Sequence, residues 1–168
     1  IITLIKHADR VKIGCLAQLV NVLGPIMTQN GGPAWRQTIF YPFMHASRYG
    51  RGIAMDTKIN APMYETKAFG DVPFIEAVAV LNEETTEITI FAVNRNQDEA
   101  LALQANLNGF EGYKVKEHIV LESKDPKAVN SAEHPDTVVP HIVEVVHEDD
   151  IIAVLPKLSW NVIRLQRV

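Results

Sequence analysis

The chain has 168 residues, of which 47% are hydrophobic and 21% charged, and its formal net charge is −4. This composition excludes a disordered or collagen-like chain and indicates a globular protein of one domain or slightly more. No stretch approaches the roughly 18 consecutive apolar residues that a membrane span needs, and the first residues do not show the basic-then-apolar-then-small pattern of a secretion signal. Lysine and arginine are scattered, so no basic patch for nucleic acid or anionic lipid is present. We therefore expect a cytoplasmic protein that binds neither nucleic acid nor a membrane.

The first part of the chain is predicted to contain a helix followed by a buried strand. Residues 1–5 are apolar, and residues 11–22 (VKIGCLAQLVNV) are almost continuously apolar, as in a parallel strand that is buried on both faces. Cys15 lies inside this run, which predicts a buried, unreactive thiol. The chain also enters this ordered pattern directly from Ile1, without a methionine, so we expect a piece of a longer protein.

A second helix is predicted after a turn-rich loop at residues 28–33. Residues 35–49 carry apolar side chains at helical spacing, and Pro42 is expected to kink the helix or remove one of its hydrogen bonds. The expected apolar face consists of Trp35, Ile39, Phe40, Phe43, Met44 and Ser47. One strand and its helix cannot form a stable layer alone, so this region needs partners.

From about residue 53 the apolar period changes from helical to two, which predicts a domain boundary between residues 1–52 and 53–168. Residues 72–81 and 86–93 flank a polar turn and are expected to form a β-hairpin. Further alternating runs follow at 101–107, 113–121, 151–158 and 159–165. The polar segment 123–136 predicts a long surface loop. A strand about every ten residues indicates a β-sandwich.

The sequence contains no complete active site. The six histidines, which lack the close spacing of a zinc site, are His7, His45, His118, His134, His141 and His147. The paired carboxylates lie in turn-like segments, where solvated charge is the ordinary explanation; they are Glu83, Glu84, Glu148, Asp149 and Asp150. Because motifs for a nucleophile elbow or a phosphate-binding loop are also missing, we expect no catalytic residue, metal or cofactor in this chain.

Gln18 and Asn21 are the candidate binding residues. They follow a predicted buried strand, and α/β sheets and barrels bind ligands at the carboxyl ends of their strands. An amide offers both a donor and an acceptor, as a sugar hydroxyl does. The alternative is a buried amide that bonds to a neighbouring loop.

Aromatic residues could also contact a sugar, but their positions favour the core. Phe40, Tyr41 and Phe43 lie at helical spacing with Trp35, which is more typical of core packing than of a stacking platform. Trp160 alternates with Asn161 and is expected to pack inside the sandwich.

The segments HADRVKIGCLAQLVNVLGPIMT and GGPAWRQTIFYPFMHASRYGRG resemble the end of the catalytic barrel of α-L-arabinofuranosidases of glycoside hydrolase family 51. The resemblance continues through TKAFGDVPFIEAVAVLNEE and TIFAVNRN to LPKLSWNVIRL. It implies a mainly β fold: residues 11–17 would be the last strand of a (β/α)₈ barrel, 35–49 its last helix, and 53–168 a jelly-roll-like C-terminal β-sandwich. Gly14 departs from the alanine common in relatives, which leaves the assignment unchanged.

The resemblance implies hydrolysis of terminal non-reducing α-L-arabinofuranosyl residues of arabinan and arabinoxylan, with retention of configuration. The two catalytic glutamates of the family correspond to positions upstream of Ile1, so only Gln18 carries over, as a residue that contacts arabinose, with Asn21 a weaker candidate. Expected partners are arabinose-containing oligosaccharides, the remainder of the barrel and further copies in a homo-oligomer. The alternative function is a non-catalytic β-sandwich for carbohydrate binding or oligomerisation.

Overall fold

The structure is a computed structural model that describes residues 1–145 and 151–168. Strands predominate, which confirms the mainly β fold class. In chain order the elements are α1 (Ile2–Lys6), β1 (Ile26–Thr28), β2 (Ala34–Arg36), α2 (Phe40–Tyr49), β3 (Ile53–Ala54), β4 (Met63–Thr66), β5 (Gly70–Pro73), β6 (Ile75–Asn82), β7 (Glu87–Asn94), β8 (Leu101–Gln104), β9 (Tyr113–Leu121), β10 (His141–Val143), β11 (Ile151–Leu155) and β12 (Ser159–Arg167). Neither helix in this described part of the chain has the length and apolarity that a membrane crossing demands.

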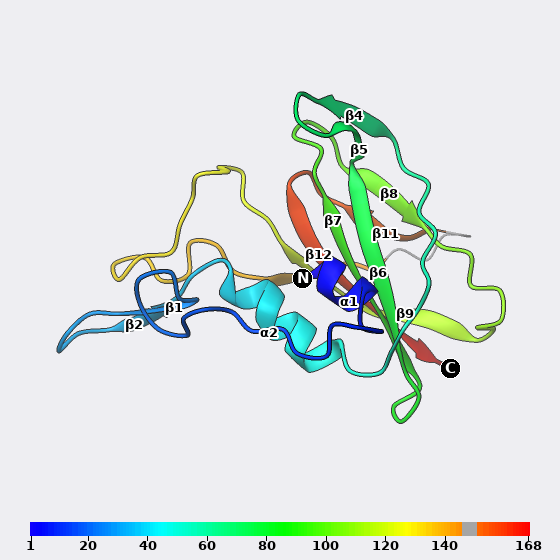
Figure 1. The fold of residues 1–168 in the computed structure, drawn as a ribbon, viewed down its shortest axis with the longest axis horizontal. Coiled ribbons are helices and arrows are strands. Elements are labelled where there is room, and N and C mark those ends of the chain that lie inside the picture. The colour runs from blue at the N-terminus through cyan, green and yellow to red at the C-terminus, as the bar shows by residue number, and fades with distance from the viewer. Residues whose placement is uncertain (146–150) are drawn as a thin grey trace.

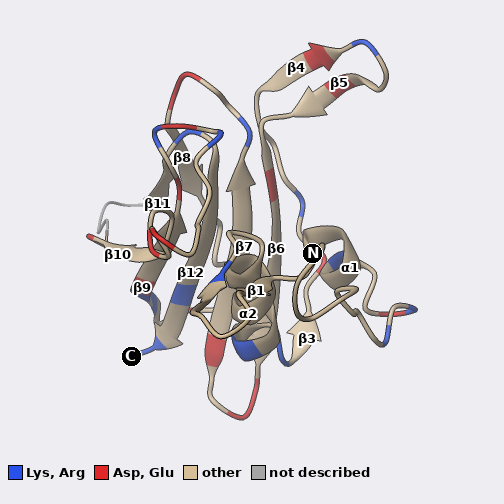
Figure 2. Ribbon diagram, turned by 90° about the vertical axis from the view of Figure 1, so that its left-hand side faces the viewer, with Lys and Arg blue, Asp and Glu red and all other residues tan. Residues whose placement is uncertain are grey.

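One antiparallel sheet of six strands, in the order β10-β9-β12-β7-β6-β3, forms the centre of the molecule (Figure 1). The predicted hairpin is confirmed as β6 and β7, in which Ile75 pairs with Asn94 and Asn82 with Glu87. The turn is held by the Asn82 side chain, whose Oδ1 accepts hydrogen bonds from the backbone N–H groups of Glu84 and Thr85. The residues before Ile75 form β5, which instead pairs with β4 in a separate hairpin that projects beyond the sheet (Figure 2).

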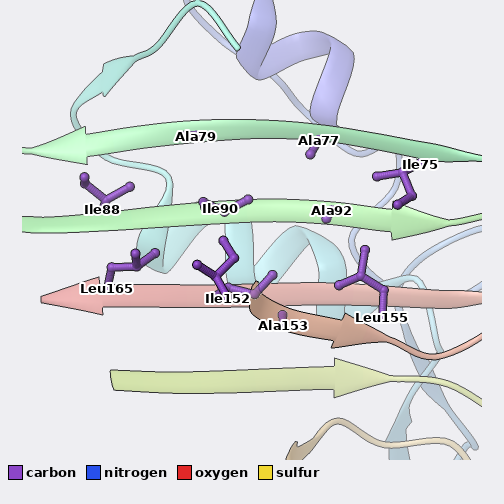
Figure 3. Packing of buried hydrophobic residues seen from close by; sticks show 11 residues of the cluster. Ile75, Ala77, Ala79, Ile88, Ile90, Ala92, Ile152, Ala153, Leu155 and Leu165 are labelled. Carbon is purple, nitrogen blue, oxygen red and sulfur yellow. The ribbon is translucent and has the colours of Figure 1, made fainter. Parts of the chain in front are cut away.

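One face of this sheet packs against the two-stranded sheet of β8 and β11. Because side chains alternate along a strand, every second residue of β6, β7 and β12 points to this side (Figure 3). The buried members of this cluster are Ile75, Ala77, Ala79, Ile88, Ile90, Ala92, Ile152, Ala153, Leu155, Ile163 and Leu165. This layer is the predicted sandwich.

The opposite face of the same sheet is also buried, by α1, α2 and part of the loop between β9 and β10. The buried members of this second cluster are Ile2, Tyr41, Val78, Val80, Phe91, Ile119, Leu121, Val138, Trp160 and Val162. Trp160 is therefore buried as predicted, but on the helix side and not inside the sandwich. The loop segment 123–136 contains no regular helix or strand, as predicted.

The predicted strand at residues 11–22 is not formed in this structure. The segment runs over the surface without regular strand pairing, apart from an isolated bridge between Val20 and Ile26. Cys15 is exposed, which corrects the prediction of a buried thiol. A strand needs hydrogen-bonding neighbours on its edges, and none of the described residues provides a ladder here.

The second helix is shorter than predicted and its buried face is rotated. It begins at Phe40, so Trp35 lies in β2, and Pro42 falls in the first turn, where its missing N–H breaks no helical hydrogen bond. Tyr41 and His45 face the sheet, whereas Phe43 lies on a surface groove.

Replacing Phe91 by alanine should destabilise the chain strongly, because its ring is fully buried and stacks on Trp160 at a centroid distance of 5.8 Å. Loss of a core phenylalanine costs about 3–5 kcal/mol. Urea denaturation measures the change, and Phe69→Ala, at a residue that is 84% exposed, is the matched control. Equal stability of the two variants would contradict the described core.

Candidate functional site

Gln18, the predicted sugar-binding residue, lies on the surface segment between α1 and β1. Its side chain is exposed and forms no hydrogen bond with any residue that the structure describes. Its amide donors and acceptor are therefore available to a ligand. The sequence analysis expected Gln18 at the carboxyl end of a strand, but in this structure the segment that contains it forms no strand.

Asn21 has a different environment, because its side chain is engaged within the chain. Its Oδ1 accepts a hydrogen bond from the backbone N–H of Thr28 at 2.7 Å, and its Nδ2 donates to Oγ1 of the same residue at 2.9 Å. Its backbone has a left-handed φ of 60°, a conformation that asparagine tolerates better than most residues. The structure thus gives Asn21 a local role in the turn that leads into β1.

Several apolar side chains of this segment are exposed. Ile13 is 82% exposed and Val22 77% exposed. A groove of about 310 Å³ lies between the segment and α2, lined by residues that include Leu16, Leu19 and Phe43. A second groove, of about 350 Å³, lies between α1 and α2. Contiguous exposed apolar surface of this kind marks a contact with another polypeptide or a ligand.

Glu87 and Glu117 are two carboxylates that share a partner, Arg164. The guanidinium donates to Glu117 Oε2 at 2.8 Å and to Glu87 Oε2 at 2.9 Å, and it lies 4.5 Å from the centre of the Tyr49 ring. Burial opposes ionisation of Glu87, but hydrogen bonds from Lys116 and Arg164 outweigh it and lower the pKa of its carboxyl. A general acid of a glycosidase needs a raised pKa, which Glu87 lacks, and both carboxylates are held by the same guanidinium, so their ion pairs join neighbouring strands of the sheet.

Two histidines are buried and neutral. Nδ1 of His45 accepts a hydrogen bond from Trp160 Nε1 at 3.2 Å, and burial lowers the pKa of His45 to about 4, with Arg48 adding to the effect. His118 Nε2 lies 3.0 Å from Asn161 Oδ1, and burial lowers the pKa of His118 as well. Both histidines join strand β12 to a neighbouring element and have no access to a ligand.

No group of three or more histidine, cysteine or carboxylate side chains within residues 1–145 and 151–168 could hold a metal ion. Glu83 and Glu84 lie in the exposed β6–β7 turn, as expected. The remaining candidates from the sequence, His147, Glu148, Asp149 and Asp150, lie outside the described residues.

Comparison with known proteins identifies the family. Residues 1–159 match the family described as α-L-arabinofuranosidase C-terminal domain. The chain belongs to this family. It is 57% identical over 167 residues to the intracellular exo-α-(1→5)-L-arabinofuranosidase of Halalkalibacterium halodurans, a match that covers 98% of the chain and 33% of that protein. It is 52% identical over 169 residues to the intracellular exo-α-(1→5)-L-arabinofuranosidase 1 of Bacillus subtilis, covering 99% of the chain and 33% of that protein.

Solved structures of the family have the same fold. A family 51 α-L-arabinofuranosidase from Bifidobacterium longum superimposes with a TM-score of 0.90 at 40% identity, covering 97% of this chain and 31% of that one. The α-L-arabinofuranosidase of Thermotoga maritima, solved as an arabinose complex, gives a TM-score of 0.77 at 26% identity, covering 95% of this chain and 35% of that one. This arabinofuranosidase C-terminal domain thus spans about a third of the length of the relatives it matches. The domain boundary between residues 52 and 53 stays a prediction.

The stability of the arabinofuranosidase domain should fall as the pH drops from about 6.5 toward 4. The unfolded chain protonates His45 near its ordinary value of 6.5, but the folded chain does so only near 4, so each pH unit in this window costs up to about 1.4 kcal/mol. His118 adds to the loss in the same direction, whereas the lowered pKa of Glu87 acts only below its ordinary 4.5.

Urea denaturation between pH 7 and pH 5 measures this slope. In a His45→Gln variant the slope should be shallower, with the remainder due to His118. The same slope in both proteins would show that His45 is not held neutral.

Proposed function

We propose that this chain is the C-terminal part of a family 51 exo-α-L-arabinofuranosidase, which removes terminal non-reducing α-L-arabinofuranosyl residues from arabinan and arabinoxylan with retention of configuration. The proposal is supported by the identities of 57% and 52% to proteins that are named for exo-arabinofuranosidase activity. Both names include the word intracellular, which supports action in the cytoplasm, on arabinose-containing oligosaccharides.

Within this enzyme, Gln18 contacts the arabinose. The observation that carries the assignment is an exposed amide with no described hydrogen-bond partner, within the segment that resembles the end of the family's catalytic barrel. A carboxamide can donate to one sugar hydroxyl and accept from another, so it orients a neutral furanose ring without adding charge. Asn21 is not assigned to the sugar, because its own amide is already bonded to Thr28.

The chemistry itself requires two carboxylates from elsewhere in the enzyme. Retention of configuration needs a nucleophile and a general acid about 5 Å apart on either side of the glycosidic bond. Glu87 and Glu117 do not fit these roles, because both are held by Arg164 and the pKa of Glu87 is lowered. This chain covers 33% of the matched relative from Halalkalibacterium halodurans, which leaves room for these groups in the remainder of the enzyme.

The remainder of the enzyme is proposed to cover the apolar surface around residues 11–24. Ile13, Val22 and Leu23 are each more than three-quarters exposed. A β-strand at 11–17 would form once neighbouring strands supply hydrogen-bond partners, which would bury Ile13, and the remainder of the enzyme would also cover Val22 and Leu23 beyond that strand. The exposed apolar surface therefore supports a docked barrel.

We further propose that the complete enzyme is a homo-oligomer, as expected from the resemblance; sedimentation velocity of the complete protein tests this.

A sugar-binding role for the isolated β-sandwich has less support. Among the described aromatic residues after position 53, only Phe69 is exposed; Phe91 and Trp160 are buried, and the others are half-buried. Titration of the chain with arabino-oligosaccharides should show no binding.

In the complete enzyme, Gln18→Ala should lower kcat/KM for an aryl arabinofuranoside by about 1–3 kcal/mol of transition-state binding, because one buried polar contact to the sugar is lost. Steady-state kinetics measures the loss. Gln104→Ala, which removes another exposed amide on β8, is the matched control and should leave the rate unchanged. Wild-type kinetics of the Gln18 variant would remove this residue from the site.

The 168-residue chain alone should release no arabinose from an aryl arabinofuranoside, since its described residues supply neither a pocket that excludes water nor a pair of suitable carboxylates. Release of the chromogenic phenol, measured against the complete enzyme at equal concentration, tests this expectation. Measurable turnover by the purified chain would contradict the proposed division of labour.

A further inference from the structure

The position of Gln18 depends on the β1–β2 hairpin. The backbone C=O of Leu19, the next residue, accepts a hydrogen bond from Ile26 N–H at 3.3 Å, and Asn21 N–H donates to the C=O of Ile26 at 2.8 Å. The Asn21 side chain adds the two bonds to Thr28. These hydrogen bonds attach the segment just after Gln18 to strand β1.

The hairpin in turn is attached to residues 53–168, the predicted β-sandwich domain, by Asn130, which lies in the loop between β9 and β10 on the helix side of the main sheet. Asn130 Nδ2 donates to the C=O of Arg36 at 2.9 Å, and Trp35 Nε1 donates to the C=O of Asn130 at 3.2 Å. These bonds join residues that are 94 and 95 positions apart in the sequence. Figure 1 shows the long loop running beside the hairpin, away from the main sheet.

Asn130 is itself fixed within the core of the domain. Only 2% of its surface is exposed, and its side chain also donates to the C=O of Val138 at 3.0 Å and accepts from the N–H of the same residue at 2.7 Å. Val138 is buried in the cluster that faces the helices. A buried amide that is fully bonded in this way permits one orientation and leaves its partners unpaired when it is lost.

We propose that Asn130 and Asn21 are positioning residues that set the location of the Gln18 amide, so that the β-sandwich helps to form the arabinose site. The contacts form a continuous chain. The buried Val138 holds Asn130, and Asn130 holds β2. Strand β2 pairs with β1, which contains Thr28, and Thr28 holds Asn21 and with it the segment of Gln18. The inference rests on the proposed role of Gln18 and extends it to residues that touch no substrate.

The first test uses the 168-residue chain and needs no activity. Asn130→Asp keeps the acceptor for Val138 N–H but removes both N–H donors, so hydrogen exchange at the Thr28 and Ile26 amides should become at least about ten-fold faster. Asn106→Asp is the matched control, because that side chain only accepts a bond from Asn108 N–H in an exposed turn, and it should change neither amide.

If the buried charge introduced by Asn130→Asp prevents folding, a second variant, Trp35→Phe, removes the bond to the Asn130 carbonyl and retains an aromatic ring. The β12 amides should stay protected in this variant while Thr28 exchange accelerates. Unchanged exchange at Thr28 in a folded variant would overturn the linkage.

The second test is a double-mutant cycle in the complete enzyme. Asn21→Gly tolerates the left-handed φ of 60° but loses both bonds to Thr28, so kcat/KM should fall about ten-fold. In a Gln18→Ala background the same change should cost less than about two-fold, because the residue that it positions is gone. A merely structural role would give the same factor in both backgrounds and would contradict the proposal.

The two tests distinguish a failure of the proposed function of Gln18 from a failure of the proposed linkage through Asn130 and Asn21. Normal kinetics of the Gln18→Ala enzyme would overturn the proposed function of Gln18, and with it any need to position that amide. The exchange experiment would still decide whether Asn130 and Asn21 link the hairpin to the β-sandwich.

Discussion

The strands β7 and β12 are buried on both faces, and this constraint organises the rest of the molecule. Val162 and Trp160 point toward the helices, whereas Ile163 and Leu165, the alternate residues of the same strand, point toward β8 and β11. Two apolar clusters therefore share one sheet. The N-terminal helices pack on one face of this sheet and the strands β8 and β11 pack on the other, so both layers depend on the same strands.

This arrangement leaves the segment that carries Gln18 outside both clusters. Helix α2 uses Tyr41 and His45 to pack on the sheet, while Phe43 faces the groove beside residues 11–24. The segment is thus held at its end by Asn21 and β1, with its apolar side chains exposed. Such a surface fits a domain that provides one edge of a ligand site and receives the other edges from a neighbouring part of the enzyme.

Local patterns in the sequence predicted most of the β-sandwich and little of the candidate site. Each of the strands β6, β7, β9 and β12 carries its own local signal, because a half-buried strand alternates apolar and polar residues and a strand that is buried on both faces is almost continuously apolar. The prediction of a strand at 11–22 failed because its pairing depends on neighbours that the described residues do not supply. The rotation of α2 and the side of the sheet on which Trp160 packs also depend on long-range contacts.

The polar residues that build the site region carry weak sequence signals. Asn130 lies in a polar segment that was expected to be solvated, and its bonds to Arg36 and Val138 become visible only when the loop is placed against the hairpin. Asn21 could have been identified as a turn residue, since asparagine tolerates left-handed positions, but its bond to Thr28, seven residues further on, is seen only in the structure. Gln18 was identified through the resemblance to the family, and its contact with arabinose stays a prediction.

The most direct test of this account is a crystal structure of the complete protein with arabinose bound. The account predicts that residues 11–17 form a parallel strand between two neighbours, that Asn21 keeps its bonds to Thr28, and that the Gln18 amide lies within hydrogen-bond distance of a sugar hydroxyl. A structure in which this segment stays unpaired on the surface, with Gln18 remote from the sugar, would contradict it.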